Sequence, residues 1–427
     1  MSVTSRPAPR EGWILAGTLD GQLARPTLLE DICGIPHLLR LACDVAVAGA
    51  TKIYILWDVA RPLPDLSTVF ADPRIARRAT LEIVTRPPAG NDTDGILVVR
   101  ADRLFHRDLP RAAIAAWQER GTIGKVSGAQ HDAVFATDRS IARELAEHAA
   151  DPGGLAAIVA KHGVAAAAPP YLAFTAAAAD RRALRRAERT LVWSLRKSAD
   201  GLVSKLVNRR LSLPLSWLLA RTPVHPNHIT LLALAFAIVG GSVISRGGYA
   251  AGLVGMLLVN LGSIIDGVDG ELARLRFQFS RTGQWLDTVV DDLANISYAG
   301  GVILSLQAAG VSWAIPLGVA ALGAFTLTQI TQYVLIWFVY RSGDLAAIPW
   351  AMQSSEQLSG RGVRSFLPKL FKRDCVLTVM VVLAIAGRLD LILIGFAVGA
   401  FVFFGVFFVQ FARHGASRRS SDRASPA

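Results

Sequence analysis

The first part of the chain alternates short apolar runs with Ala-rich helical stretches. The apolar runs have the length of buried strands and lie at 13–16, 52–57, 80–85, 95–100 and 133–136. A helical pattern over 36–48 separates the first two runs. This alternation predicts a Rossmann-like α/β domain, an open sheet with helices on both faces, over residues 1–175.

Longer apolar segments follow in the second part of the chain. They lie at about 228–245, 249–268, 284–307, 311–340, 375–389 and 391–412, and each approaches the length that spans a bilayer. Arg and Lys gather in the links after the second and fourth segments and in the tail, so the positive-inside rule places both termini in the cytoplasm. We therefore expect an all-α bundle of six transmembrane helices over 223–412 in the inner (cytoplasmic) membrane. A disordered basic tail is predicted over 413–427.

Between these regions, residues 176–222 interleave Arg and Lys with Leu, Val and Trp. This pattern predicts basic amphipathic juxtamembrane helices whose Leu and Trp side chains enter the acyl layer while their arginines meet anionic lipid phosphates. A solvated linker helix between the two domains is the alternative interpretation.

Composition agrees with a membrane protein. The chain is 52% hydrophobic and 18% charged, and its net charge is +12. Because apolar spans are present, an anionic lipid surface accounts for this charge better than a nucleic acid, and no nucleic-acid partner is expected. The three cysteines form no CxxC pair, which argues against a disulfide framework or a zinc site. Residues 1–10 lack the apolar core of a cleavable signal.

Four carboxylates lie within the second and third apolar segments. If both are helical, Asp266 and Asp269 share one helix face, and Asp287 and Asp291 share another. Carboxylates that converge in a medium of low dielectric constant repel one another unless divalent cations neutralise them. Hard oxygen ligands suit Mg²⁺, Mn²⁺ or Ca²⁺ rather than zinc. A pair of metal ions is therefore predicted.

The same residues resemble the motif of the CDP-alcohol phosphotransferase (CDP-alcohol phosphatidyltransferase) family at every fixed position. The motif reads Asp266-x2-Asp269-Gly270-x2-Ala273-Arg274-x8-Gly283-x3-Asp287-x3-Asp291. The resemblance implies transfer of a substituted phosphate group from a CDP-alcohol to an acceptor hydroxyl with release of CMP, using two divalent cations, Mg²⁺ or Mn²⁺. It implies Asp266, Asp269 and Asp287 as metal ligands and Asp291 as the base and also a ligand. It also implies a homodimer.

Other positions around the motif have two interpretations each. Gly270, Gly283 and Ala273 leave room for the nucleotide or for a facing helix, and Arg274 pairs with the diphosphate or braces a ligand. Asn227, in a Pro-Asn-x-x-Thr stretch that resembles the entry found in relatives, contacts the nucleotide or caps a helix.

Asp292 points about 100° away from Asp291, and we leave open whether it belongs to the site. Glu271 is expected to be solvated or to support a ligand. Candidates for binding a phosphorylated acceptor or a lipid headgroup are Arg209, Arg210, Arg221, Arg361 and Arg364.

The stretch from Leu15 to Pro26 resembles the start of a sugar-phosphate nucleotidyltransferase. It departs from that pattern because Leu19 and Asp20 interrupt the glycine-rich loop and Arg25 replaces the expected lysine. Asp102 follows an apolar run at the position of a metal-binding aspartate. The first domain is therefore expected to be degenerate and to serve as a scaffold, regulator or nucleotide binder.

The order of the two regions resembles bifunctional enzymes that make CDP-inositol from inositol phosphate and CTP and couple it to another inositol phosphate. We predict an integral membrane transferase of phospholipid or polyol-phosphate biosynthesis. Its donor is CDP-diacylglycerol or a CDP-polyol, and its acceptor is an alcohol or phosphoalcohol. The alternatives are a bifunctional cytidylyltransferase and CDP-inositol-type phosphotransferase and, in other classes, a non-catalytic membrane anchor or a cation transporter.

Overall fold

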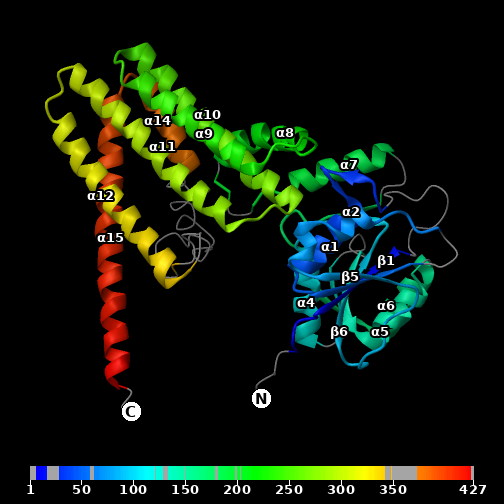
Figure 1. The fold of residues 1–427 in the computed structure, drawn as a ribbon. Helices are drawn as coiled ribbons and strands as arrows, with labels where there is room; N and C mark the ends of the chain where they lie inside the picture. Colours follow the sequence, from blue (N-terminus) through cyan, green and yellow to red (C-terminus); the bar gives the residue numbers. More distant parts are fainter. Residues whose placement is uncertain are drawn as a thin grey trace. The chain divides into compact units, whose positions relative to one another are not determined.

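The computed structural model describes residues 6–16, 28–57, 62–120, 122–127, 133–149, 151–177, 181–197, 200–201, 203–341, 348 and 373–424. The chain divides into two compact units (Figure 1). Unit 1 comprises Met1–Ser198, Trp217–Thr222 and Arg274–Gln278, and unit 2 comprises Ala199–Ser216, Pro223–Ala273 and Phe279–Ala427.

Unit 1 is built on a seven-stranded sheet with the order β10-β8-β9-β6-β1-β4-β5. Every strand predicted from the sequence is present: β1 (Glu11–Leu15), β4 (Lys52–Leu56), β5 (Thr80–Val84), β6 (Gly95–Arg100) and β9 (Val134–Asp138). Strands β8 (Ile123–Val126) and β10 (Val164–Ala167) complete the sheet. β9 pairs antiparallel with both of its neighbours, and the other pairs in the sheet are parallel. Two-stranded sheets are formed by β2 (Asp31–Ile32) with β3 (Ile35–Pro36) and by β7 (Arg103–Phe105) with β11 (Thr175–Ala177).

Helices cover both faces of the seven-stranded sheet, as predicted. Strand β1 shows the alternation that requires this: Ile14 packs in one buried cluster, and Trp13 and Leu15 pack in another. The first cluster includes residues of α1 (His37–Val47), α2 (Ser67–Phe70), α3 (Pro73–Ala76) and α4 (Leu109–Arg120). The second includes residues of α5 (Arg139–Glu147) and α6 (Pro152–His162). The α/β fold predicted for this region is confirmed.

Helix α7 (Arg181–Trp193) is amphipathic as predicted, but its apolar face contacts protein. Leu184, Leu191 and Val192 are buried within unit 1, where α7 packs against β7 and β11. The expectation that these side chains enter lipid is therefore wrong. An amphipathic pattern specifies an apolar partner without saying whether that partner is protein or lipid. The arginines at 181, 182, 185, 186 and 189 remain exposed.

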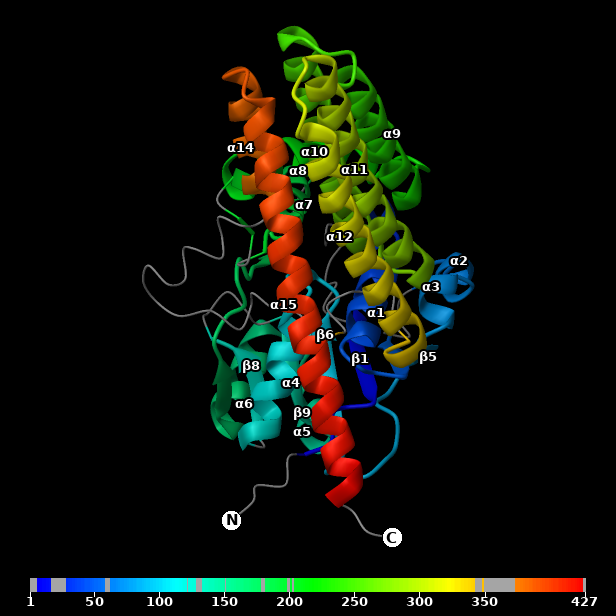
Figure 2. The ribbon, with the colours of Figure 1, turned by 90° about the vertical axis from the view of Figure 1, so that its left-hand side faces the viewer.

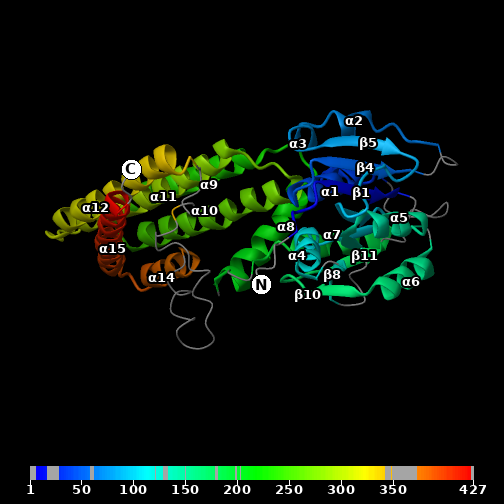
Figure 3. The same ribbon diagram turned by 90° about the horizontal axis from the view of Figure 1, so that it is seen from below.

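Unit 2 is helical. Its elements are the π-helix η2 (Ser204–Asn208), most of α8 (Arg209–Leu219), α9 (Pro226–Ile244), α10 (Tyr249–Arg276, whose last residues belong to unit 1), α11 (Arg281–Ala308), α12 (Ala314–Val334), the π-helix η3 (Leu335–Val339), α14 (Arg373–Ile385) and α15 (Leu389–Ala424). Figure 3 shows α9, α10 and α11 running alongside one another, and Figure 2 shows α12 beside α15.

Five helices among the described residues are long and apolar enough to cross a membrane. They are α9, α10, α11, the continuous α12 and η3, and α15 as far as Arg413. Unit 2 thus has the helices of an integral membrane protein. Helix α14 covers 13 described residues and is shorter than a membrane span. The count of six spans and the orientation of the termini stay predictions.

The end of α15 differs from the predicted disordered tail, because the helix runs through Arg413 to Ala424. Arg and Ala, which favour a helix, recur through this segment, and the first proline beyond α15 is Pro426. The packing of α9 against α11 depends on glycine: a Cβ on Gly301 would lie 2.3 Å from the carbonyl oxygen of Gly241. Small residues of this kind allow close approach between membrane helices.

Candidate metal centre and active site

Helices α10 and α11 carry the acidic motif. Ser280 caps the start of α11, where its hydroxyl accepts a hydrogen bond of 2.9 Å from the backbone N–H of Gly283. Asp266 and Asp269 follow one another at i, i+3 on α10, and Asp287 and Asp291 at i, i+4 on α11. The two acidic faces predicted from the helical spacing therefore exist in the fold.

Three of the four carboxylates meet. Ligand oxygens of Asp266, Asp269 and Asp287 all lie within 4.8 Å of one another. Asp269 is buried and Asp287 is exposed, so the cluster is open at the Asp287 side. The Oδ1 atom of Asp266 is buried without a hydrogen-bond partner. A buried, unpaired carboxylate oxygen among other carboxylates fits a site for hard divalent cations.

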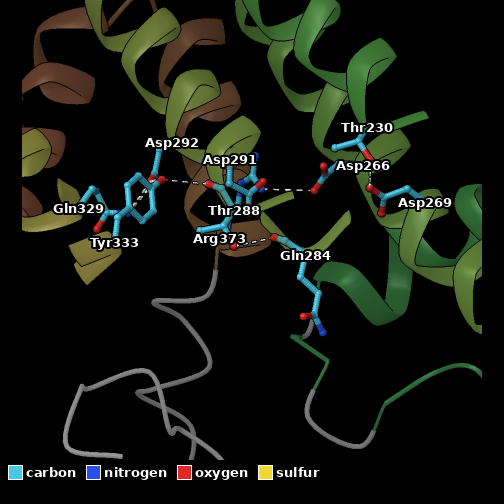
Figure 4. A network of polar contacts seen from close by, with 10 residues as sticks. All are labelled: Thr230, Asp266, Asp269, Gln284, Thr288, Asp291, Asp292, Gln329, Tyr333 and Arg373. Carbon is cyan, nitrogen blue, oxygen red and sulfur yellow. Dashed lines mark hydrogen bonds and ion pairs between the residues drawn. The ribbon is translucent and has the colours of Figure 1, made fainter. Parts of the chain in front are cut away.

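Asp291, predicted as both base and ligand, lies outside this close group of three. Its Oδ1 pairs with the guanidinium of Arg373, the first residue of α14 (Figure 4). Arg373 Nη1 also lies 3.4 Å from Oδ2 of Asp266. Sequence analysis recognised Arg373 only as part of a basic link. The 82 residues between it and Asp291 leave no local signal of their contact.

Asp269 is held by donors on two sides. The hydroxyl of Thr230 in α9 donates to its Oδ2, and the backbone N–H of Gly270 donates to its Oδ1. Thr230 belongs to the Pro-Asn-x-x-Thr stretch identified in the sequence, but that pattern did not reveal its partner. A ligand carboxylate that accepts hydrogen bonds is fixed in orientation before a cation arrives.

The structure also brings Asn227 and Gly283 together. A Cβ on Gly283 would lie 3.3 Å from the Oδ1 of Asn227. Gly283 therefore leaves space for the asparagine side chain. The N-cap of α9 is His225, whose Nδ1 accepts from the Asn227 N–H at 3.2 Å, so the alternative that Asn227 is the cap is wrong. Its predicted nucleotide contact stays a prediction.

Two motif positions and one neighbour remain to be placed. The division between the two units falls between Ala273 and Arg274. The roles predicted for these two residues stay predictions. Asp292 faces α12: its carboxylate accepts from Gln329 Nε2 at 2.7 and 2.6 Å and from the Tyr333 hydroxyl. Figure 4 shows this group on the side of α11 away from Asp266. Asp292 therefore supports the helix pair rather than the metal centre.

Several basic candidates are already paired. Arg209 binds acidic side chains in unit 2, and Arg221 pairs with Glu188 at 2.6 Å. Arg361 and Arg364 lie outside the described residues. In unit 1, Asp102 is held by Arg100 at 2.8 Å and by Arg103 at 3.2 Å. The interrupted loop with Leu19, Asp20 and Arg25 also lies outside the described residues.

Comparison with known proteins finds similarity in the helical region. Residues 223–403 match the model of the CDP-alcohol phosphatidyltransferase family. The chain is 34% identical over 145 residues to the bifunctional IPC transferase and DIPP synthase of Rubrobacter xylanophilus, a match covering 34% of this chain and 32% of the relative. It is 35% identical over 126 residues to the protein of the same name from Thermococcus kodakarensis, covering 29% and 27%. The chain thus spans about a third of the length of the curated relatives it matches.

Among solved structures, the chain has a likeness to a putative glucose-1-phosphate thymidylyltransferase from Bacillus anthracis in complex with a sucrose. The sequence identity is 9% and the TM-score is 0.30, with 42% of this chain and 94% of that chain covered. This similarity is too low to support a conclusion about the fold.

Proposed function

We propose that this protein transfers a substituted phosphate from a CDP-alcohol to an acceptor hydroxyl and releases CMP, as the match of residues 223–403 to the CDP-alcohol phosphatidyltransferase family supports. The observation that carries the proposal is the convergence of Asp266, Asp269 and Asp287 within 4.8 Å. These residues would hold two divalent cations, Mg²⁺ or Mn²⁺, which neutralise the diphosphate oxygens when bound.

The chain's own residues supply the remaining chemistry. The acceptor oxygen forms a bond to the phosphorus that carries the alcohol, the bond from that phosphorus to the CMP oxygen breaks, and CMP leaves with the electron pair. Asp291 takes the proton of the acceptor hydroxyl, and Arg373 holds the Asp291 carboxylate at the edge of the site. The same guanidinium can neutralise a phosphate on the acceptor.

For the donor and the acceptor we propose chemical classes and not individual compounds. Both relatives are named bifunctional IPC transferase and DIPP synthase, which agrees with the resemblance to bifunctional enzymes noted in the sequence. From that resemblance we propose a CDP-polyol donor beside CDP-diacylglycerol and a phosphorylated polyol as acceptor. Anionic lipids are the proposed neighbours of the exposed arginines on α7. A homodimer is proposed from family membership, and a monomeric mass for the active particle would contradict it.

The nucleotidyltransferase activity of a bifunctional enzyme is a separate proposal. We propose that unit 1 lacks it, because Asp102, the candidate metal ligand, is neutralised by two arginines. Incubation of the protein with CTP and inositol phosphate would then yield no CDP-inositol and no pyrophosphate. Formation of both products would establish the bifunctional alternative.

The test of the transferase is CMP release by the purified full chain from CDP-diacylglycerol and CDP-inositol, with Mg²⁺ or Mn²⁺ and a panel of acceptor alcohols. We expect metal-dependent release that Asp291→Asn abolishes. Asp390→Asn is the matched control, because Asp390 lies in the first turn of α15, bound to Arg388 and outside the site. No release from any donor would favour the membrane anchor. Cation flux across vesicles without CMP release would favour the transporter.

A further inference from the structure

Glu271 occupies a position that the motif leaves unspecified, between Gly270 and Ala273. Sequence analysis expected it to be solvated or to support a ligand, yet its side chain is completely buried. Its carboxylate accepts hydrogen bonds from Ser212 Oγ at 2.7 Å and from Ser216 Oγ at 2.5 Å, and it pairs with the guanidinium of Arg209. A buried carboxylate is costly unless it is fully paired in this way.

The partners of Glu271 form one face of α8. Arg209, Ser212 and Ser216 follow one another at i, i+3 and i+7, which places their side chains in line along that helix. Arg209 is itself fixed, because it makes two hydrogen bonds of 3.0 Å to the carboxylate of Asp200. All of these residues belong to unit 2. The network joins α8 to α10 through a single acidic side chain.

The position of Glu271 on α10 relates this network to the metal centre. Glu271 is two positions after Asp269, which corresponds to about 200° around a helix, so the two side chains leave α10 on opposite sides. On the Asp269 side, α10 is held by Thr230 of α9. On the Glu271 side, it is held by α8. The rotation of α10, and with it the position of Asp266 and Asp269, is therefore fixed from both sides.

We infer that Glu271 is a positioning residue of the metal centre: by binding Arg209, Ser212 and Ser216 it holds α10 in the rotation that brings Asp266 and Asp269 to Asp287. The inference rests on the proposed function, since it assigns cation binding to those three carboxylates. Glu271 touches no reacting atom. Its removal would loosen the ligands without removing any of them, and loss of a supporting contact typically weakens metal binding by roughly 10- to 100-fold.

The experiment measures Mn²⁺ binding to the full chain in lipid nanodiscs by electron paramagnetic resonance, so that the readout does not depend on turnover. We expect Glu271→Gln, which keeps the shape but loses the charge, to weaken Mn²⁺ binding about tenfold, and Glu271→Ala to weaken it further. Ser212→Ala combined with Glu271→Gln should weaken binding by less than the product of the two single effects, because both act through one contact.

The control separates positioning from general destabilisation. Ile303→Ala removes a buried side chain from the α11 core, about 18 Å along the helix from Asp291. It should lower the unfolding temperature as much as Glu271→Gln does and leave Mn²⁺ affinity unchanged. Wild-type affinity in Glu271→Gln, or an equal loss in Ile303→Ala, would overturn the inference while leaving the proposed function intact. A wild-type protein that binds no Mn²⁺ and releases no CMP would overturn both.

Discussion

Asp102 in unit 1 and Asp266 in unit 2 are both aspartates that sequence analysis connected with metal binding, and their surroundings differ. Asp102 accepts two hydrogen bonds from Arg100, two residues away, and pairs with Arg103 as well. Asp266 has a carboxylate oxygen that is buried and unpaired, beside two further carboxylates. Arg100 occupies both oxygens of Asp102, whereas Arg373 approaches only Oδ2 of Asp266, at 3.4 Å, and leaves Oδ1 unpaired. A carboxylate is available to a metal ion where at least one of its oxygens has no fixed cationic partner.

The largest effect is expected from Asp287→Asn, which removes one of the three converging carboxylates. CMP release should fall about a thousandfold, because the charge that balances the cations is lost while the helix is preserved. Steady-state assay with saturating CDP-alcohol measures this, and Mn²⁺ titration shows whether the loss is in metal binding. Activity within tenfold of wild type would remove Asp287 from the metal centre.

A second prediction concerns how the helices that carry the centre are held together. Gly301→Ala places a methyl group 2.3 Å from the carbonyl oxygen of Gly241 and should destabilise unit 2 by about 2–3 kcal/mol. Thermal unfolding of the full chain in detergent would show the loss. Gly300→Ala is the matched control, because a Cβ there has no atom within 4 Å. Equal unfolding temperatures for the two variants would contradict the close packing of α9 and α11.

The next prediction concerns Asp44, a buried acidic side chain of unit 1 for which no catalytic or binding role is proposed. Burial raises the pKa of Asp44 to about 7, against an ordinary value of 3.8. Because the pKa of Asp44 is higher in the folded state than in the unfolded state, the stability that this side chain contributes is complete below about pH 4. That stability is lost as the pH rises through 7. Asp44→Asn should therefore gain on the order of 3 kcal/mol over wild type between pH 4.5 and pH 8, because each pKa unit corresponds to about 1.4 kcal/mol.

Hydrogen exchange of β1 and β4 amides in the full chain, measured by mass spectrometry at both pH values, follows the stability of unit 1 directly. Glu82→Gln, in the less buried β5, is a suitable control for a general change of charge. A difference between wild type and Asp44→Asn that does not vary with pH would show that Asp44 stays in one protonation state.

The smallest effect is expected from Asp102→Asn. Since arginines already neutralise this carboxylate, its loss should change CMP release less than threefold and leave Mn²⁺ binding to the full chain unchanged. The assay is the one used for Asp287→Asn, so the two variants test the comparison of the two aspartates under the same conditions. A loss approaching that of Asp287→Asn would show that Asp102 also serves the transferase.

Features that repeat locally along the chain could be predicted from the amino-acid sequence. Short apolar runs located β1, β4, β5, β6 and β9 to within about two residues, because a buried strand needs a continuous apolar run. Apolar length located five helices that are long enough to cross a membrane, but it missed the last eight residues of α10 and predicted a span at 375–389, where α14 is too short for one. The motif spacing placed Asp266 and Asp269 on one helix face and Asp287 on another, since helical geometry fixes those angles.

Contacts between residues far apart in the sequence became visible only in the folded chain. Arg373 pairs with Asp291 across 82 residues, and Ser212 reaches Glu271 across 59. The apolar face of α7 contacts protein where its pattern suggested lipid. A periodic pattern of apolar residues indicates that a helix face is buried against an apolar partner, but it does not identify that partner. That choice depends on how helices and strands pack, and packing is a property of the whole chain.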